Sequence, residues 1–189
     1  MNSKKIRAVY TDSTIRVYQA FSPLIADEAV TLGTFGHHFK MDRMTWIKPS
    51  FLWMMYRCGW ASKDHQERVL AIDIAREGFD FAVSTAVRSS YSPSLGITFE
   101  EWQAQVAASD VRVQWDPERD ISGRPLGYRS IQLGLRGDAV RRYVNEWIRG
   151  ITDITEYVTG LDAARRSGAD ISHLLPEEKV YPTGSEDTQ

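Results

Sequence analysis

A basic and aromatic block between residues 37 and 60 carries the densest set of side chains that could do chemistry. Cations interleaved with flat rings suit a nucleotide, because rings stack on bases while arginine and lysine bind phosphates. Lys48 directly precedes a predicted helix at Pro49, whose free N–H groups would also favour an anion. We therefore predict ligand binding by Arg43, Trp46, Lys48, Tyr56 and Arg57.

The same block also has a purely structural interpretation. Four of its side chains repeat at helical spacing, and such an aromatic stripe is typical of a helix that faces the core. They are Trp53, Tyr56, Arg57 and Trp60. We expect the two tryptophans in the core and leave Trp46 open between core and ligand. Charges inside an apolar block need partners or a ligand, which keeps Arg43 and Lys48 as candidates.

Three acids stand within five positions in the segment 114–120. At the end of a strand, Asp116 and Glu118 could bind Mg²⁺ or act as a general acid or base. The alternative is a tight Asp-Pro turn whose acids pair with neighbouring arginines. We take Glu118 and Asp116 as candidate catalytic residues.

A polar strand face is predicted between residues 128 and 134. Alternation places Tyr128, Ser130, Gln132 and Gly134 on one face and Arg129, Ile131 and Leu133 on the other. The first face groups hydroxyls and an amide beside a glycine that admits close approach of a ligand. A plain edge strand with a polar outer face is an equal alternative. Gln132 is our third candidate catalytic residue, and Arg129 a candidate for orienting the substrate.

An early strand offers two further ligand-binding candidates, Tyr18 and Gln19. Gln19 stands among apolar neighbours, so its amide needs a buried hydrogen-bond partner.

The histidines and the single cysteine give weaker indications of a functional site. His37 and His38 could bind a metal with Asp42 or His65, but adjacent histidines in a loop point apart, so no structural metal is expected. Cys58 has no histidine placed locally as its base, and we expect a buried structural thiol.

Composition excludes several classes of protein. With 42% hydrophobic and 25% charged residues, the chain is an ordinary globular sequence, and its single cysteine excludes an internal disulfide framework. No stretch approaches the roughly 20 apolar residues that span a bilayer, and no apolar run follows the first residues as in a signal peptide, so we expect a cytoplasmic protein without membrane contact.

Motifs of P-loop, dinucleotide-binding, serine-hydrolase and zincin enzymes (GxxxxGK[ST], GxGxxG, GxSxG and HExxH) are absent from the sequence.

The net charge of −2 hides an uneven distribution. Residues 1–60 hold eight Lys/Arg against four Asp/Glu, giving +4, and the other 129 residues hold fifteen against twenty-one, giving −6. A bulk polyanion-binding protein is usually more basic than pI 6.1, so any anion site is local.

Hydrophobic patterning predicts one α+β domain over residues 1–162, with a mixed or antiparallel sheet flanked by helices, and a polar C-terminal tail over 163–189, frayed from Thr183. Extended segments are expected at 6–10, 14–21, 44–48, 69–74, 111–115 and 128–135, with a turn at Asp116-Pro117. Helices are expected from Ser22-Pro23 to Gly33 and over 51–57, 99–108, 139–150 and 152–160, and the segment 79–87 fits either a helix or a strand.

Four strings spread over about Ile6 to Thr155 resemble the bacterial and fungal domain-of-unknown-function family 4291. They are IRAVYTDSTIRVYQAF, RMTWIKPSFLWMMYRCGWA, VRVQWDPERD and YRSIQLGLRG. The resemblance implies no activity, but it implies that the blocks singled out above belong to one shared pocket.

A fainter likeness covers under a fifth of the chain. Val17-Tyr18-Gln19-Ala20, followed by a helix and Gly33-Thr34-Phe35, is similar to the opening of ADP-ribosyltransferases. This likeness implies an NAD-contacting role for Gln19, where those enzymes have His or Arg, and a catalytic role for Glu118.

Three hypotheses follow. The first is a nucleotide- or nucleic-acid-directed enzyme, in its most concrete form an NAD-using glycosyl or ADP-ribosyl transferase. The second is a non-catalytic RNA- or DNA-binding module that uses the block 37–60. The third is an interaction protein whose tryptophans form core and interface, and a homo-oligomer stays open.

Overall fold

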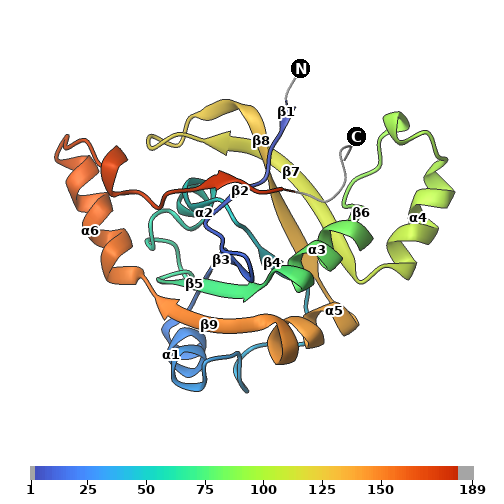
Figure 1. The fold of residues 1–189 in the computed structure, drawn as a ribbon, viewed down its shortest axis with the longest axis horizontal. Helices are drawn as coiled ribbons and strands as arrows, with labels where there is room; N and C mark the ends of the chain where they lie inside the picture. The colour runs from blue at the N-terminus through green and yellow to red at the C-terminus, as the bar shows by residue number, and fades with distance from the viewer. Residues whose placement is uncertain (1–2, 183–189) are drawn as a thin grey trace.

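The computed structural model describes residues 3–182 of the chain. Its strands are β1 (Ser3–Lys4), β2 (Arg7–Ala8), β3 (Thr14–Phe21), β4 (Thr45–Ile47), β5 (Arg68–Ala75), β6 (Val87–Arg88), β7 (Val111–Arg119), β8 (Pro125–Leu135), β9 (Ile148–Asp153) and β10 (Lys179–Val180). Its helices are α1 (Pro23–Leu32), α2 (Phe51–Cys58), α3 (Arg76–Thr85), α4 (Phe99–Ala108), α5 (Gly137–Arg142) and α6 (Thr155–Arg166). The fold is α+β with mixed sheets, which confirms the predicted class (Figure 1).

Two sheets curl toward each other. The larger has the order β1-β8-β7-β6, with β4 also paired to β8, and the smaller has the order β3-β5-β9. A single bridge between Tyr18 and Lys48 connects β3 to the end of β4 and so joins the two sheets. Strands β2 and β10 form a separate antiparallel pair. The end of β4 therefore lies where the sheets meet.

Two apolar clusters fill the molecule. The first lies between the sheets and includes Val17 and Ile72 from the smaller sheet and Ile47 and Leu133 from the larger one. The second lies on the other face of β3 and β5, where Tyr18 and residues of α2 and α6 pack together. One face of the larger sheet thus packs against the first cluster, and its other face is left for polar side chains.

Helices α1, α2 and α4 begin and end close to where the sequence predicts. Pro23 opens α1, and Gly33, with φ of 71°, ends it in the left-handed conformation that glycine adopts without strain. In α2 the hydroxyl of Ser50 accepts a hydrogen bond from the backbone N–H of Trp53, and Gly59 ends the helix in the same left-handed conformation. Capping residues therefore fix the position of α2 directly after Lys48.

The predicted turn at Asp116-Pro117 is wrong, because β7 continues through it to Arg119. Pro117 pairs with Arg129 of β8, and β6 reaches only Arg112 and Val113 on the other side of β7. At Pro117 the strand is therefore an edge, where a residue without an N–H is tolerated.

The predicted helix 139–150 is wrong at its end. Helical turns run from Gly137 to Trp147, the last of them π-helical, and the chain then enters β9. Ile148, Ile151 and Thr152 are β-branched residues that favour a strand, and their backbone pairs with β5. The helix predicted from 152 accordingly begins only at Thr155.

The segment after residue 162 packs against the domain as far as the structure describes it. Helix α6 continues to Arg166, β10 pairs with β2, and Tyr181 is buried in the first apolar cluster. Residues 172–182 are called the C-terminal strap below. The predicted fraying from Thr183 lies outside the described residues.

Candidate functional site

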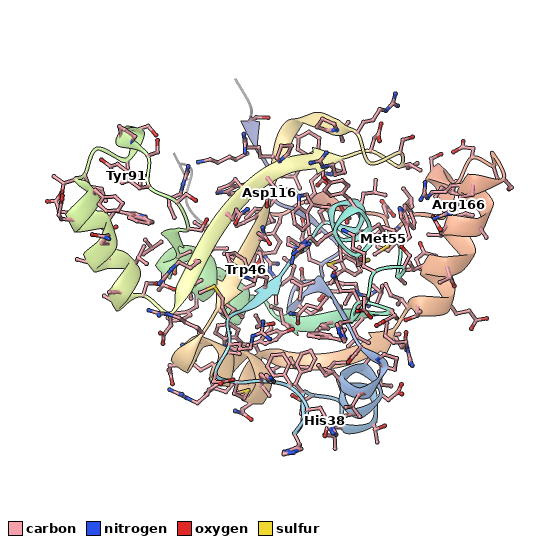
Figure 2. The ribbon with its side chains drawn as sticks, turned by 180° about the vertical axis from the view of Figure 1, so that it is seen from behind. His38, Trp46, Met55, Tyr91, Asp116 and Arg166 are labelled. Atoms are coloured by element: carbon pink, nitrogen blue, oxygen red, sulfur yellow. The ribbon has the colours of Figure 1, made fainter. Side chains whose placement is uncertain are left out.

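A polar face of the larger sheet gathers several of the predicted site residues. Register pairs Gln114 with Gln132, Asp116 with Ser130, and Trp46 with Gly134, so these side chains share the face that points away from the apolar cluster between the sheets. Gly134 permits this arrangement, because a Cβ there would lie 2.6 Å from Met44 Sδ and 3.0 Å from the Trp46 ring. Figure 2 labels Asp116 and Trp46 near the middle of the molecule, with the helix that carries Met55 beside them.

Asp116 is fixed on this face by two glutamine amides. Gln114 Nε2 donates to Oδ1 at 2.9 Å, and Gln132 Nε2 donates to Oδ2 at 2.7 Å. Both carboxylate oxygens are thereby held in place while the group stays partly accessible to solvent. The arrangement suits a carboxylate that accepts a proton at a defined position.

Lys48 is the buried cation of the site, with only 6% of the residue exposed. Its Nζ lies 5.3 Å from the centre of the Trp53 ring, a cation–π contact. Within residues 3–182 no hydrogen bond or ion pair satisfies this ammonium group. Burial, reinforced by the positive charge of Arg57, lowers the pKa of Lys48 to about 7, and Asp116 and Cys58 oppose the shift.

These contacts define the Lys48 site: Trp46, Lys48, Trp53, Arg57, Gln114, Asp116 and Gln132. It is built from β4, the α2 helix and the β7–β8 hairpin, and capping by Ser50 fixes the start of α2, which carries Trp53 against Lys48 and also carries Arg57.

Glu118 lies next to this site, at the N-terminus of α2. Its Oε1 accepts hydrogen bonds from the Ser50 hydroxyl and the Arg119 backbone N–H, both at 2.9 Å. Only 3% of the residue is exposed, and burial raises the pKa of Glu118 above its ordinary value against the effect of these hydrogen bonds. A carboxyl group that holds a proton more readily than usual can serve as a general acid.

Glu118 also lines a cavity of about 830 Å³ between the tip of the β7–β8 hairpin and the C-terminal strap. Arg7, Tyr128 and Glu178 line it as well. Glu178 accepts a 2.7 Å hydrogen bond from the backbone N–H of Phe51, and burial, with a smaller effect of the Glu118 charge, raises the pKa of Glu178 to about 8. The cavity therefore holds two carboxyl groups whose pKa values are both raised by burial.

Two predicted residues lie away from this face, in the interior. Gln19 donates to Thr45 Oγ1 at 2.7 Å and to the Trp46 carbonyl at 3.0 Å, and it accepts from the Tyr143 hydroxyl at 2.7 Å. This closed network supplies the partner that the sequence required of Gln19. Tyr18 packs against Phe51 in the second apolar cluster and is 1% exposed.

Three more predicted residues lie outside the Lys48 site. Arg129, on the opposite face of β8, donates to the Trp115 carbonyl at 2.8 Å. Arg43 lines a separate cavity of about 280 Å³ together with His38, which Figure 2 places at the lower edge of the molecule. Tyr56 is exposed, and the Arg119 guanidinium lies 3.9 Å from the centre of its ring, beside the hairpin.

The structure therefore brings together Trp46, Lys48, Arg57, Asp116 and Gln132, with Glu118 beside them. Sequence reasoning missed the role of Gln114 in holding Asp116 and the presence of Glu178 in the cavity. Alternation along β7 places Gln114 and Asp116 on one face and could have indicated the first, whereas the sequence around Glu178 carries no such signal.

The described residues contain no group of three or more His, Cys, Asp or Glu side chains placed to hold a metal ion. His38, a candidate ligand, instead lies 3.2 Å from a Glu28 carboxylate oxygen. In the same part of the chain, none of the helices has the length and apolar character needed to cross a membrane.

Comparison with known proteins identifies one protein family. The family model described as a domain of unknown function (DUF4291) matches residues 5–181, nearly the whole chain. The curated proteins include no match to this sequence.

Proposed function

The chain belongs to the DUF4291 family, and from the geometry of the Lys48 site we propose that it is an enzyme that transfers a group to or from a nucleotide, a nucleotide cofactor or a nucleic-acid end.

The observation that carries the proposal is the buried Lys48 ammonium, which lacks an anionic partner at ion-pair distance in the described residues. A buried charge is costly unless it is paired, so an anionic ligand would complete this site. Arg57 adds a second, exposed cation close enough to lower the pKa of Lys48. Two neighbouring cations favour a ligand with phosphate groups.

The neighbouring groups support acid–base chemistry on such a ligand. Asp116, held by two amides, would accept a proton, and Glu118 would donate one. Trp46, partly buried beside Lys48, offers a ring for base stacking. The adjacent cavity of about 830 Å³, which is lined by Glu118 but not by Lys48 or Asp116, is large enough for a nucleotide-sized molecule. Glycosyl transfer, with NAD as one candidate substrate, is the most concrete form of the proposal.

The second hypothesis, a nucleic-acid-binding module, has less support. It needs the rings of the block 37–60 at the surface, because bases stack on exposed aromatic faces. Four of the six rings are almost fully buried: Phe39 (7%), Phe51 (1%), Trp53 (7%) and Trp60 (8%).

Calorimetric titration with NAD, ATP and a short RNA tests the proposal. We expect at least one of them to bind, and we expect Lys48→Met to weaken this binding at least about tenfold, because a charge-assisted contact is lost. Lys40→Met is the matched control, since Lys40 belongs to the same block but is exposed and should leave binding unchanged. Absence of binding for all three ligands, or an equal effect of both variants, would refute the proposal.

A further inference from the structure

The surroundings of the Lys48 side chain suit a nucleophile in addition to a phosphate anchor. Trp53 covers one side of the amine at 5.3 Å. The nearby Asp116 carboxylate is not at ion-pair distance, because the amides of Gln114 and Gln132 hold its two oxygens. An amine that is shielded, unpaired and close to a fixed proton acceptor has the surroundings of an activated nucleophile.

Resting on the proposed function, we infer that Lys48 is the nucleophile of a glycosyl transfer, and that its Nζ bonds to the anomeric carbon of a phosphate-bearing ribose.

The step balances without an additional reactant. The neutral amine attacks C1′, the bond from C1′ to the leaving base breaks, and the base departs with the electron pair. A purine base takes a proton from the Glu118 carboxyl, whereas the nicotinamide of NAD departs as a neutral molecule without one. Asp116 accepts the proton that the attacking nitrogen loses. The ring oxygen then leaves C1′ and takes up that proton, which gives a protonated imine between Lys48 and an open-chain ribose. Water or an acceptor amine can then release the sugar from the enzyme.

The charges around the amine favour its neutral form. Arg57 on α2 disfavours the ammonium, while Asp116 on β7 and Cys58 on α2 act in the opposite direction, and burial outweighs both. With a pKa of about 7 instead of 10.5, about half of the Lys48 amine is neutral at pH 7, roughly a thousandfold more than for an ordinary lysine. The protonated fraction of Lys48 and Arg57 can bind the phosphate together, and the neutral fraction of Lys48 can react.

The chain offers a matched control in Lys4. Its Nζ lies 5.7 Å from the centre of the Trp115 ring, and burial lowers its pKa as well. The charges that act on Lys4 are those of Arg88 and Arg129, and no carboxylate is among them. Lys4 therefore shares the tryptophan contact and the lowered pKa of Lys48, but not the proton acceptor.

Reductive trapping tests the inference. The full-length protein is incubated with ribose 5-phosphate and cyanoborohydride at pH 7, and the adduct at each of the six lysines is quantified by peptide mass spectrometry. We expect Lys48 to be labelled at least about tenfold faster than Lys4, and ribose without phosphate to remove this preference. The labelling rate of Lys48 should rise with pH and level off above about pH 7.

A second variant separates nucleophile from phosphate anchor. Lys48→Arg keeps a cation but cannot form an imine, so it should retain nucleotide binding while the adduct at this position is lost. Labelling of Lys48 no faster than Lys4, while NAD or ATP binds, would overturn the covalent role and leave the proposed function standing. Labelling of Lys48 in a protein that binds none of the nucleotides would instead overturn the proposed function.

Discussion

Replacing Lys48 by methionine should stabilise the protein in a pH-dependent manner. The folded state lowers the pKa of Lys48 from 10.5 to about 7, so between these values the unfolded chain binds more protons than the folded one. Above pH 10.5 Lys48 therefore does not lower the free energy of unfolding. As the pH falls from 10.5 to 7 the free energy of unfolding decreases, and below about pH 7 the decrease is complete. Methionine has a similar length, no charge, and can pack against Trp53.

The magnitude follows from the same shift. At about 1.4 kcal/mol per pH unit, the full depression corresponds to roughly 5 kcal/mol, of which about 2 kcal/mol falls between pH 7 and pH 9. We expect Lys48→Met to exceed the natural protein in free energy of unfolding at pH 6 and pH 7. This advantage should shrink by about 2 kcal/mol on going to pH 9.

Urea unfolding followed by circular dichroism at pH 6, 7, 8 and 9 gives the required free energies. Comparing two proteins at each pH cancels the titration of all other groups. The exposed Lys40, changed to methionine, is the control and should show no pH-dependent difference. If the Lys48→Met difference stays constant within about 0.5 kcal/mol from pH 7 to pH 9, the lysine titrates as an exposed one and the reasoning fails.

Two further predictions concern the groups around the site. Burial raises the pKa of Glu178 to about 8, so this residue stabilises the fold fully below pH 4.5 and less as the pH rises toward 8. Glu178→Gln, whose amide oxygen can still accept the Phe51 N–H, should flatten the fall of unfolding free energy between pH 5 and pH 8 by roughly 3.5 kcal/mol, and an unchanged pH profile would contradict this. Tyr143→Phe should cost about 1–3 kcal/mol of stability because it leaves a buried oxygen of Gln19 without its donor, and it should leave nucleotide binding unchanged. The exposed Tyr157, changed to phenylalanine, should cost less than about 1 kcal/mol, and equal losses would contradict the assignment.

Much of the local structure could be predicted from the sequence. Capping residues such as Pro23, Ser50 and Gly59 determine where helices begin and end, because they act within a few positions of themselves. Strand β9 could not be predicted in this way. The apolar spacing of a helix runs up to Trp147, and only pairing with β5, about 75 positions earlier, makes the following residues extended.

The residues of the site could be predicted from the sequence better than their arrangement in space. Residue type and alternation indicate Lys48, Asp116 and Gln132 as candidates, since charges and amides in apolar surroundings need partners. Their proximity depends on β8 pairing with both β4 and β7, and sequence alone does not determine that register. Glu178 reaches the cavity only because the C-terminal strap crosses the fold, which no local pattern indicates.

Lys48 and Gln19 show how structure separates a polar residue that serves the fold from one that needs another explanation. Gln19 is buried, and the side-chain amide forms hydrogen bonds with three other residues of the protein. Its place in the interior is therefore explained by packing and hydrogen bonding. Lys48 is equally buried, but within residues 3–182 its ammonium has no such partner, and an apolar side chain of the same length would make the fold more stable. A lysine at this position costs stability in the folded state, and the proposed role of its amine, in binding a phosphate or attacking a sugar, would explain why a lysine is there.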